Sequence, residues 1–115
     1  MPQISAGEDK ASIESQLETL RQNGWEISGK GGLQKTFYFK TYTKVADFHH
    51  VIATRCKSEN HHPTMTTRAG SIDVHWITHS PPGLSHKDPK MAMYCDEQAR
   101  HIGTTEPSQA RKCGP

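Results

Sequence analysis

The chain has 115 residues, with 14 Lys and Arg against 12 Asp and Glu, eight His and three Cys. Only 32% of the residues are hydrophobic and the mean hydropathy is −0.79, so the chain can build one modest core and therefore one domain. The formal net charge of +2 argues against direct binding of nucleic acid, and no apolar run approaches the roughly 18 residues that a membrane span needs.

The N-terminal part of the chain predicts an amphipathic helix after a disordered segment. Residues 1–10 are polar and acidic, so we expect neither fixed structure nor a secretory signal there. From Ser12 onward, apolar residues recur at the spacing of one helical face, namely Ile13, Leu17 and Leu20. Asn23-Gly24 then ends the helix, because both residues tolerate the left-handed conformation.

A β-hairpin and a second helix are expected next. Trp25 and Ile27 alternate with a polar residue, residues 29–32 supply a turn, and the alternation over residues 33–40 predicts an antiparallel partner strand. Thr43 is expected to cap the second helix, which must end before Pro63. The apolar stripe of that helix consists of Val45, Phe48 and Ile52.

The rest of the chain predicts two further strands and a third helix. Residues 64–68 form a weak third strand, and a clear fourth strand places Ile72, Val74, Trp76 and Thr78 on one face. Residues 80–83 break that strand. Residues 85–88 resemble a capping box that opens a helix reaching Ile102, with an irregular start at Pro89.

The order of elements is therefore αββαββα. Strands joined mostly as hairpins, with amphipathic helices between them, predict an α+β fold in which three helices cover one face of a four-stranded antiparallel sheet. The expected organisation is a disordered segment at 1–10, one domain at 11–102 and a flexible polar tail at 103–115.

Histidine is the unusual component of this composition. His61-His62 lie between the second helix and Pro63, and His79 ends the fourth strand, where it could meet the pair in space. Such a set offers a proton donor and an acceptor on opposite sides of a small substrate, as acid/base elimination requires. Loop capping or contact with a helix end explains the pair equally well from the pattern alone. We interpret His49, His86 and His101 as solvated surface residues.

Several segments together resemble the family of pterin-4a-carbinolamine dehydratase, also known as the dimerisation cofactor of a homeodomain transcription factor. The resemblance covers residues 11–102, and its pieces are 24–25, 32–40, 45–48, 59–63, 78–79 and 83–88. The specific combination is His61-His62-Pro63 followed sixteen residues later by His79, then Gly83-Leu84-Ser85 and Asp88.

The resemblance implies a fold, an assembly and a reaction. The fold is the predicted one, usually assembled as a homotetramer, with a dimer as the alternative. The reaction is the dehydration of 4a-hydroxytetrahydrobiopterin to quinonoid dihydropterin, which recycles the cofactor of aromatic amino-acid hydroxylases. No metal and no organic cofactor is implied. A transcription factor is the implied second partner, with the cytoplasm as the main location and the nucleus as a further one.

The resemblance also implies roles for individual residues. His61 and His79 are the expected proton-transfer pair, while His62 and Asp88 are expected to bind the pterin. An imidazolium can protonate the departing 4a-hydroxyl and a neutral imidazole can remove the remaining proton, since both forms coexist near an ordinary pKa of about 6.5. Asp88 has a second interpretation as the N-terminal cap of the third helix.

Some positions depart from the family pattern. Lys57 replaces a commoner acidic residue, which predicts a less basic His61, and Thr64-Met65 replaces an acidic-aromatic pair. Ala69 stands at a usually aromatic position and Pro89 at an apolar one. These changes concern pterin affinity and catalysis rather than the fold.

Two alternatives belong to other functional classes. The first is a metal site formed by His61, His62, His75 and His79 with Glu59 or Cys56, although this spacing matches no metal signature. The second is an interaction protein that stabilises a transcription factor dimer after its enzymatic site has weakened. The three cysteines lack CxxC spacing and are odd in number, which favours a reducing compartment.

Overall fold

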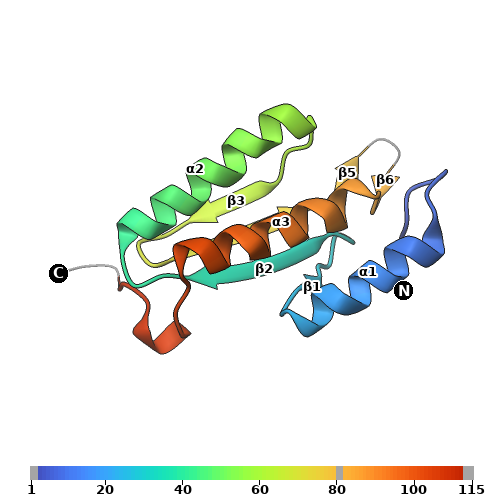
Figure 1. The fold of residues 1–115 in the computed structure, drawn as a ribbon. Coiled ribbons are helices and arrows are strands. Elements are labelled where there is room, and N and C mark those ends of the chain that lie inside the picture. Colours follow the sequence, from blue (N-terminus) through green and yellow to red (C-terminus); the bar gives the residue numbers. More distant parts are fainter. Residues whose placement is uncertain (1–2, 80–81, 113–115) are drawn as a thin grey trace.

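The protein, described here by a computed structural model over residues 3–79 and 82–112, is a two-layer α+β domain (Figure 1). The helices are α1 (Lys10–Gln22), α2 (Tyr42–Glu59) and α3 (Lys87–Ile102), with a short 3₁₀ helix at Pro107–Gln109. The main sheet comprises β1 (Glu26–Ile27), β2 (Leu33–Tyr38), β3 (Thr64–Thr67) and β4 (Ser71–Trp76). A small hairpin of β5 (Thr78–His79) and β6 (Pro82–Gly83) precedes α3.

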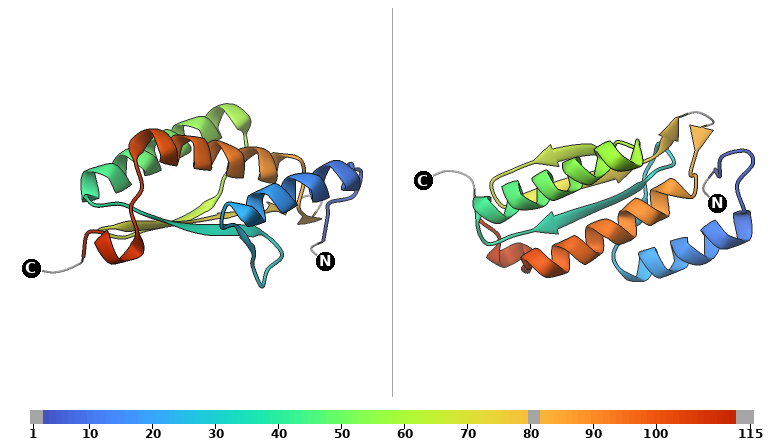
Figure 2. Two further views of the ribbon diagram at one scale, coloured as in Figure 1. Left: turned by 60° about the horizontal axis from the view of Figure 1, so that its bottom comes forward. Right: turned by 45° about the horizontal axis from the view of Figure 1, so that its top comes forward.

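The main sheet has the order β1-β2-β4-β3, and each neighbouring pair is antiparallel. Leu33 pairs with Trp76 and Phe37 with Ile72, so the apolar residues of β2 and β4 share one face. The three long helices lie over that face and leave the other uncovered, as the left view of Figure 2 shows. The predicted fold class and element order are therefore confirmed.

The core forms where the predicted apolar face of the sheet packs against the predicted apolar stripes of the helices. The strand residues Ile72, Val74 and Trp76 are buried with Phe37 and Phe39. The α2 stripe packs into the same cluster, and the Phe37 and Phe48 ring centroids lie 4.8 Å apart. Burial of these groups supplies most of the stabilising free energy of the domain.

Two helices begin two residues earlier than their sequence patterns predict, because residues just outside the apolar stripes cap them. Asp9 precedes α1 and its carboxylate accepts a hydrogen bond from the Ser12 amide at 3.2 Å. Thr41, rather than Thr43, caps α2, since its hydroxyl oxygen accepts from the Lys44 amide at 3.2 Å. The predicted cap at Thr43 is wrong for this reason.

The fourth strand is shorter than predicted. It ends at Trp76, and Thr78 then pairs with Gly83 in the β5–β6 hairpin rather than continuing along the main sheet. The predicted break at 80–83 is only partly described, because residues 80–81 lie outside the described residues while Pro82–Gly83 is strand β6. The chain turns at this point, so Thr78 and His79 leave the plane of β4 and approach the start of α3.

The segments that flank the helices and strands make defined contacts. The Ser5 amide donates to the Leu84 carbonyl at 2.8 Å, and Glu8 accepts from the His86 amide at 2.9 Å. After α3, the Thr105 amide donates to the Tyr38 carbonyl at 2.9 Å. The Arg111 amide donates to the Phe39 carbonyl at the same distance, so residues 103–112 return along the end of β2.

Two cysteines lie inside the core as free thiols. Cys56 is on α2 and Cys95 on α3, and burial raises the pKa of each thiol above its ordinary value. Both are therefore protonated and unreactive at neutral pH in the folded chain. No helix within residues 3–79 and 82–112 is both long and apolar enough to cross a bilayer.

Candidate active site

His61 owes its position to the way α2 ends. Asn60 adopts a left-handed conformation with φ of 52°, which stops the helix and turns the chain toward the sheet. The His61 ring then packs on Trp76, with centroids 5.6 Å apart and an interplanar angle of 16°. Only 9% of His61 is exposed. A protonatable ring is thus held at the edge of the core in one orientation.

Asp88 is the hydrogen-bonding centre of the site. Its Oδ1 lies 2.6 Å from His61 Nε2. Its Oδ2 accepts from the Thr78 hydroxyl at 2.8 Å and from the Ser85 amide at 2.9 Å. Asp88 is fully buried in the first turn of α3, so these donors replace water around its carboxylate.

Asp88 contacts both the backbone at the start of α3 and the His61 ring. The Ser85 amide donates to Asp88 Oδ2, which is one of the two bonds of a capping box. The Ser85 hydroxyl accepts from the Lys87 amide at 3.2 Å instead of from the Asp88 amide, so the predicted capping box is only partly formed. The other carboxylate oxygen contacts His61 at the same time. Because both oxygens are occupied and buried, Asp88 has no exposed acceptor with which to contact a dissolved ligand directly.

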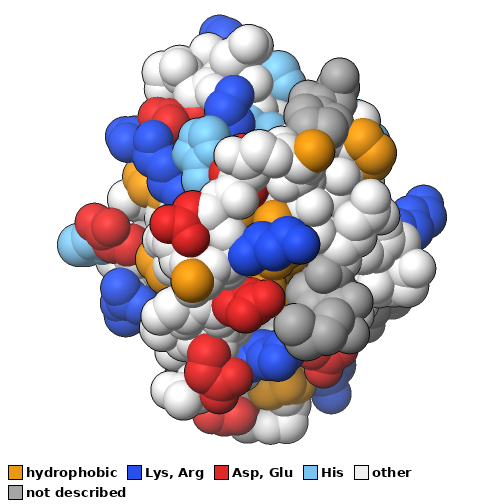
Figure 3. Space-filling view, turned by 90° about the vertical axis from the view of Figure 1, so that its right-hand side faces the viewer, with side chains coloured by type: hydrophobic (Ala, Val, Ile, Leu, Met, Phe, Trp, Pro, Cys, Tyr) orange, Lys and Arg blue, Asp and Glu red, His pale blue; other side chains and the backbone are white. Residues whose placement is uncertain are grey.

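The other two predicted histidines are each the chain neighbour of a residue in this cluster. His62 is exposed directly after His61, and His79 is exposed on β5 next to Thr78. Neither imidazole makes a hydrogen bond within the described part of the chain, so both side chains can contact a ligand. Imidazole groups gather with charged side chains in the upper part of the face drawn in Figure 3.

The carboxylate next to His61 comes from α3 rather than from the preceding turn of α2. Lys57 is exposed in the last turn of α2, where the family resemblance predicts an acidic residue. Glu59 is directed elsewhere, since it pairs with Lys90 at 2.6 Å and with Arg55 at 3.5 Å. Asp88 therefore places a carboxylate beside His61 although the acidic residue that the resemblance predicts at position 57 is missing.

The metal alternative finds no support in the arrangement of donors. Among residues 3–79 and 82–112, no three His, Cys, Asp or Glu side chains converge as ligands for one ion. His75 and His61 belong to different hydrogen-bonded groups, because His75 contacts Ser28 whereas His61 contacts Asp88.

Sequence reasoning missed the contacts of Thr78, Ser85 and His75. Thr78 and Ser85 hydroxyls lie 2.6 Å apart beside Asp88, and the only sequence signal was their place within the two family motifs. His75 Nε2 lies 2.7 Å from Ser28 Oγ on the uncovered face of the sheet. No local pattern links residues 28 and 75, because strand pairing brings them together.

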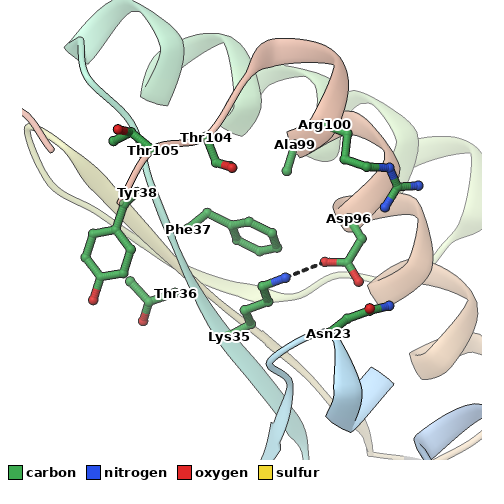
Figure 4. Close-up of a pocket in the computed structure, with 10 residues that line it drawn as sticks. All are labelled: Asn23, Lys35, Thr36, Phe37, Tyr38, Asp96, Ala99, Arg100, Thr104 and Thr105. Carbon is green, nitrogen blue, oxygen red and sulfur yellow. Dashed lines mark hydrogen bonds and ion pairs between the residues drawn. The ribbon is translucent and has the colours of Figure 1, made fainter. Parts of the chain in front are cut away.

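A separate pocket of about 260 Å³ lies between β2, the second half of α3 and the segment after it (Figure 4). Lys35 Nζ and Asp96 Oδ1 pair across it at 2.8 Å, and Trp25 Nε1 donates to the other oxygen of Asp96 at 3.0 Å. None of the predicted site residues lines this pocket. The paired charges indicate a contact that joins β2 to α3.

Comparison with known proteins assigns the chain to a family. The family described as pterin 4 alpha carbinolamine dehydratase matches residues 7–98, a range that includes His61, His62, His79 and Asp88. The chain belongs to this family. The Brucella melitensis protein described as a transcriptional coactivator/pterin dehydratase has a similar crystal structure, with a TM-score of 0.69 and 26% identity. That match covers 77% of this chain and 94% of the Brucella chain.

Curated relatives are similar over most of their length. Each carries the name "Putative pterin-4-alpha-carbinolamine dehydratase". The Rhizobium meliloti relative is 34% identical over 92 residues, covering 79% of this chain and 86% of its own. The Chlorobium limicola relative is 33% identical, with 80% and 84% covered. The Jannaschia relative is 29% identical, with 80% and 95% covered. The family model thus covers every helix and strand up to residue 98, which excludes the last turn of α3 and the 3₁₀ helix.

Proposed function

We propose that this protein dehydrates 4a-hydroxytetrahydrobiopterin to quinonoid dihydropterin and so recycles the cofactor of aromatic amino-acid hydroxylases. The observation that carries the proposal is the buried contact between His61 and Asp88, next to the exposed His62 and His79. Family membership supports the substrate class. The arrangement provides one ring held in place and two accessible rings.

Asp88 determines which nitrogen of His61 can exchange a proton with substrate. A carboxylate oxygen accepts hydrogen bonds, so His61 Nε2 carries the hydrogen that points at Asp88 Oδ1. Nδ1 is then the atom available for proton exchange. Asp88 is thus a positioning residue that orients His61, a role that we propose in place of direct pterin binding.

The reaction needs one proton delivered and one removed. The lone pair of pterin N5 expels the 4a-hydroxyl, which leaves as water when an imidazolium protonates it. A neutral imidazole takes up the proton that the pterin then loses, so the total number of protons on the protein is unchanged, and the two imidazoles end the turnover with their protonation states exchanged. We assign these two transfers to His61 and His79, and we assign His62 to holding the pterin ring.

An absorbance assay of carbinolamine dehydration tests the proposal. Wild-type protein should accelerate the reaction, and a His61→Ala, His79→Ala double variant should return it close to the uncatalysed rate. Circular dichroism should show that the double variant keeps its helices and sheet. No acceleration by the wild type at micromolar concentration would overturn the dehydratase proposal.

A binding module is the second candidate, favoured by the words transcriptional coactivator in the name of the Brucella protein. In this alternative the chain stabilises a transcription factor dimer and enzymatic activity is weak or absent. Pull-down of a homeodomain transcription factor by both wild type and the double variant, without dehydration by either, would place this candidate first. We further propose a homotetramer, or a dimer, located in the cytoplasm with the nucleus as a second site.

A further inference from the structure

The segment before α1 packs against the connecting segment, residues 84–86, that joins β6 to α3 (Figure 1). The Leu84 amide donates to the Gln3 carbonyl at 2.9 Å, and the Ser5 amide donates to the Leu84 carbonyl at 2.8 Å. Leu84 and Ser5 are both buried. The beginning of the chain is therefore one of the supports of the connecting segment.

The two segments approach each other closely at Gly83. This residue has a φ of 116°, in a region that glycine adopts readily and other residues rarely adopt. A Cβ atom at position 83 would lie 2.9 Å from the Gln3 carbonyl oxygen and 3.1 Å from the Ser5 amide nitrogen. Glycine therefore meets two requirements here, the backbone conformation and the close approach of the N-terminal segment.

Glu8 supplies a hydrogen-bond acceptor that α3 lacks at its start. His86 precedes the first turn of α3, and its own side chain makes no capping hydrogen bond. The His86 amide instead donates to Glu8 Oε1 at 2.9 Å, and the same oxygen lies 3.0 Å from His86 Nδ1. Only 19% of the Glu8 side chain is exposed. A carboxylate at this end of a helix is also favoured by the helix dipole.

Glu8 has a fixed position in the chain from which to make this contact. Its amide donates to the Ser5 carbonyl at 3.4 Å, and the next residue, Asp9, caps α1. The buried apolar residues of α1 belong to the hydrophobic core. The Glu8 carboxylate therefore links the well-packed start of α1 to the start of α3.

The connecting segment also supplies groups to the candidate active site. The Ser85 amide donates to Asp88 Oδ2 at 2.9 Å, and Ser85 Oγ lies 2.6 Å from Thr78 Oγ1. Leu84 and His86, the two chain neighbours of Ser85, both contact the N-terminal segment. The same three residues thus connect the N-terminal segment to the hydrogen-bonded cluster around Asp88.

We infer that Glu8 is a positioning residue for the pair of Asp88 and His61, an inference that rests on the proposed function. By accepting from the His86 amide, Glu8 fixes the backbone of the connecting segment, which includes the Ser85 donor. Asp88 loses a hydrogen-bond donor when this backbone moves, and its contact with His61 becomes less constrained. Glu8 touches no substrate in this scheme and acts through the Asp88 carboxylate.

Glu8→Ala and Thr41→Ala are a matched pair of variants that test this role. Each removes the side-chain acceptor at the start of a helix, but Thr41 caps the end of α2 that is opposite to His61. In the carbinolamine dehydration assay, Glu8→Ala should lower kcat about 5-fold with a smaller change in KM, as the loss of one net hydrogen bond predicts. Thr41→Ala should keep kcat near the wild-type value. Equal kcat values in the two variants would overturn the inference.

Two further variants identify the contact through which Glu8 acts. Glu8→Gln keeps an acceptor oxygen for the His86 amide, so it should recover part of the lost kcat. His86→Ala keeps the amide and removes only a ring whose side chain is 67% exposed, so kcat should stay near wild type. A loss in His86→Ala as large as that in Glu8→Ala would contradict the inference, because the exposed ring would then carry the effect.

Amide hydrogen exchange measures the same effect without turnover. The Ser85 amide hydrogen lies in the bond to Asp88, so its exchange rate reports local opening of the connecting segment. Exchange should be about 5-fold faster in Glu8→Ala than in the wild type, and unchanged in Thr41→Ala. An unchanged rate in Glu8→Ala would overturn the inference even if kcat falls.

The two assays separate this inference from the proposed function. Turnover by the wild type together with an unchanged kcat in Glu8→Ala would preserve the dehydratase and remove the positioning role. Absence of turnover by the wild type would remove the dehydratase and the positioning role in catalysis. Faster Ser85 exchange in Glu8→Ala would in that case show that Glu8 still fixes the connecting segment.

Discussion

His61 Nε2 lies 2.6 Å from Asp88 Oδ1, although 27 positions separate the two residues in the chain. The contact joins the end of α2 to the first turn of α3, and Thr78 connects the same carboxylate to the hairpin that carries His79. The orientation of one proposed catalytic ring and the position of the other therefore depend on a single buried carboxylate.

Replacement of Asp88 by Asn should impair turnover more than binding. The amide keeps the shape of the carboxylate but removes its charge and one acceptor oxygen, so it can no longer both orient His61 and accept from Thr78 and Ser85. We expect kcat to fall by about 10²-fold, at the low end of the range for acid/base groups, with a smaller change in KM.

Asp96→Asn is the matched control for this prediction. Asp96 is also a buried aspartate of α3 that accepts two side-chain hydrogen bonds, from Trp25 and Lys35, but it contacts no histidine. This variant should lower the unfolding free energy by about 1.5–3 kcal/mol while kcat stays near wild type. Equal losses of kcat in the two variants at equal stability would show that the Asp88 effect is only structural.

The fold was predictable because its signals are local. Two predicted apolar patterns pack together as one core in the structure. They are the α2 stripe of Val45, Phe48 and Ile52 and the β4 alternation of Ile72, Val74 and Trp76. The helix starts were less predictable. Asp9 and Thr41 are capping residues that lie outside the apolar stripes, so the apolar spacing neither placed the first helix start before Ser12 nor favoured Thr41 over Thr43 as a cap.

For the candidate site, the sequence predicted only the residues that belong to the family motifs. His61, His62, His79 and Asp88 were selected through the resemblance, but no pattern predicted which of them would touch. The Ser28–His75 contact had no sequence signal at all. It depends on the strand register of β1, β2 and β4 and on the close approach that Gly32 allows.

Trp76→Ala should destabilise the domain by about 3–5 kcal/mol, as other large core truncations do. Trp76 is fully buried among the strand and helix residues of the core. Chemical denaturation of the variant should therefore show a much lower midpoint. A negligible shift would mean that the packing face assigned to β4 is incorrect, whereas Trp76→Phe should recover part of the loss.

We expect the protein to form a homotetramer, or a dimer, and its molar mass in solution tests this. The chain is poor in apolar residues, one face of its sheet is uncovered, and the family resemblance implies an oligomer. Light scattering should give two or four times the chain mass of 12.9 kDa. A monomer at micromolar concentration would contradict this prediction.

His75 should make the folded state less stable on acidification. Burial lowers the pKa of His75 in the folded state below the ordinary value of about 6.5, so the unfolded chain binds this proton more readily. The contribution of neutral His75 to the free energy of unfolding is therefore present above about pH 6.5 and is lost as the pH falls through the pKa of His75 in the folded state.

A His75→Gln variant isolates this contribution. Its unfolding free energy should fall less than that of the wild type between about pH 7.5 and 5.5. His50→Gln, at an exposed position of α2, is the control and should follow the wild type. The assignment fails if His75→Gln loses as much stability as the wild type over this interval.

Replacement of each candidate histidine should change a kinetic parameter that reflects its assigned role. A group that transfers a proton acts mainly in the transition state, so His61→Ala and His79→Ala should each lower kcat by about 10²–10⁴-fold with little change in KM. His62 is assigned to holding the ring, so His62→Ala should raise KM more than it lowers kcat.

The pH profile and an external base distinguish proton transfer from a general loss of structure. Wild-type turnover should vary between about pH 5 and 8, where imidazole changes charge. Added imidazole should restore part of the activity of His79→Ala, whose side chain is exposed, but little of His61→Ala, whose site is enclosed by Trp76 and Asp88. Wild-type turnover in His79→Ala, or a flat profile over this range, would remove the assigned roles and favour the binding module.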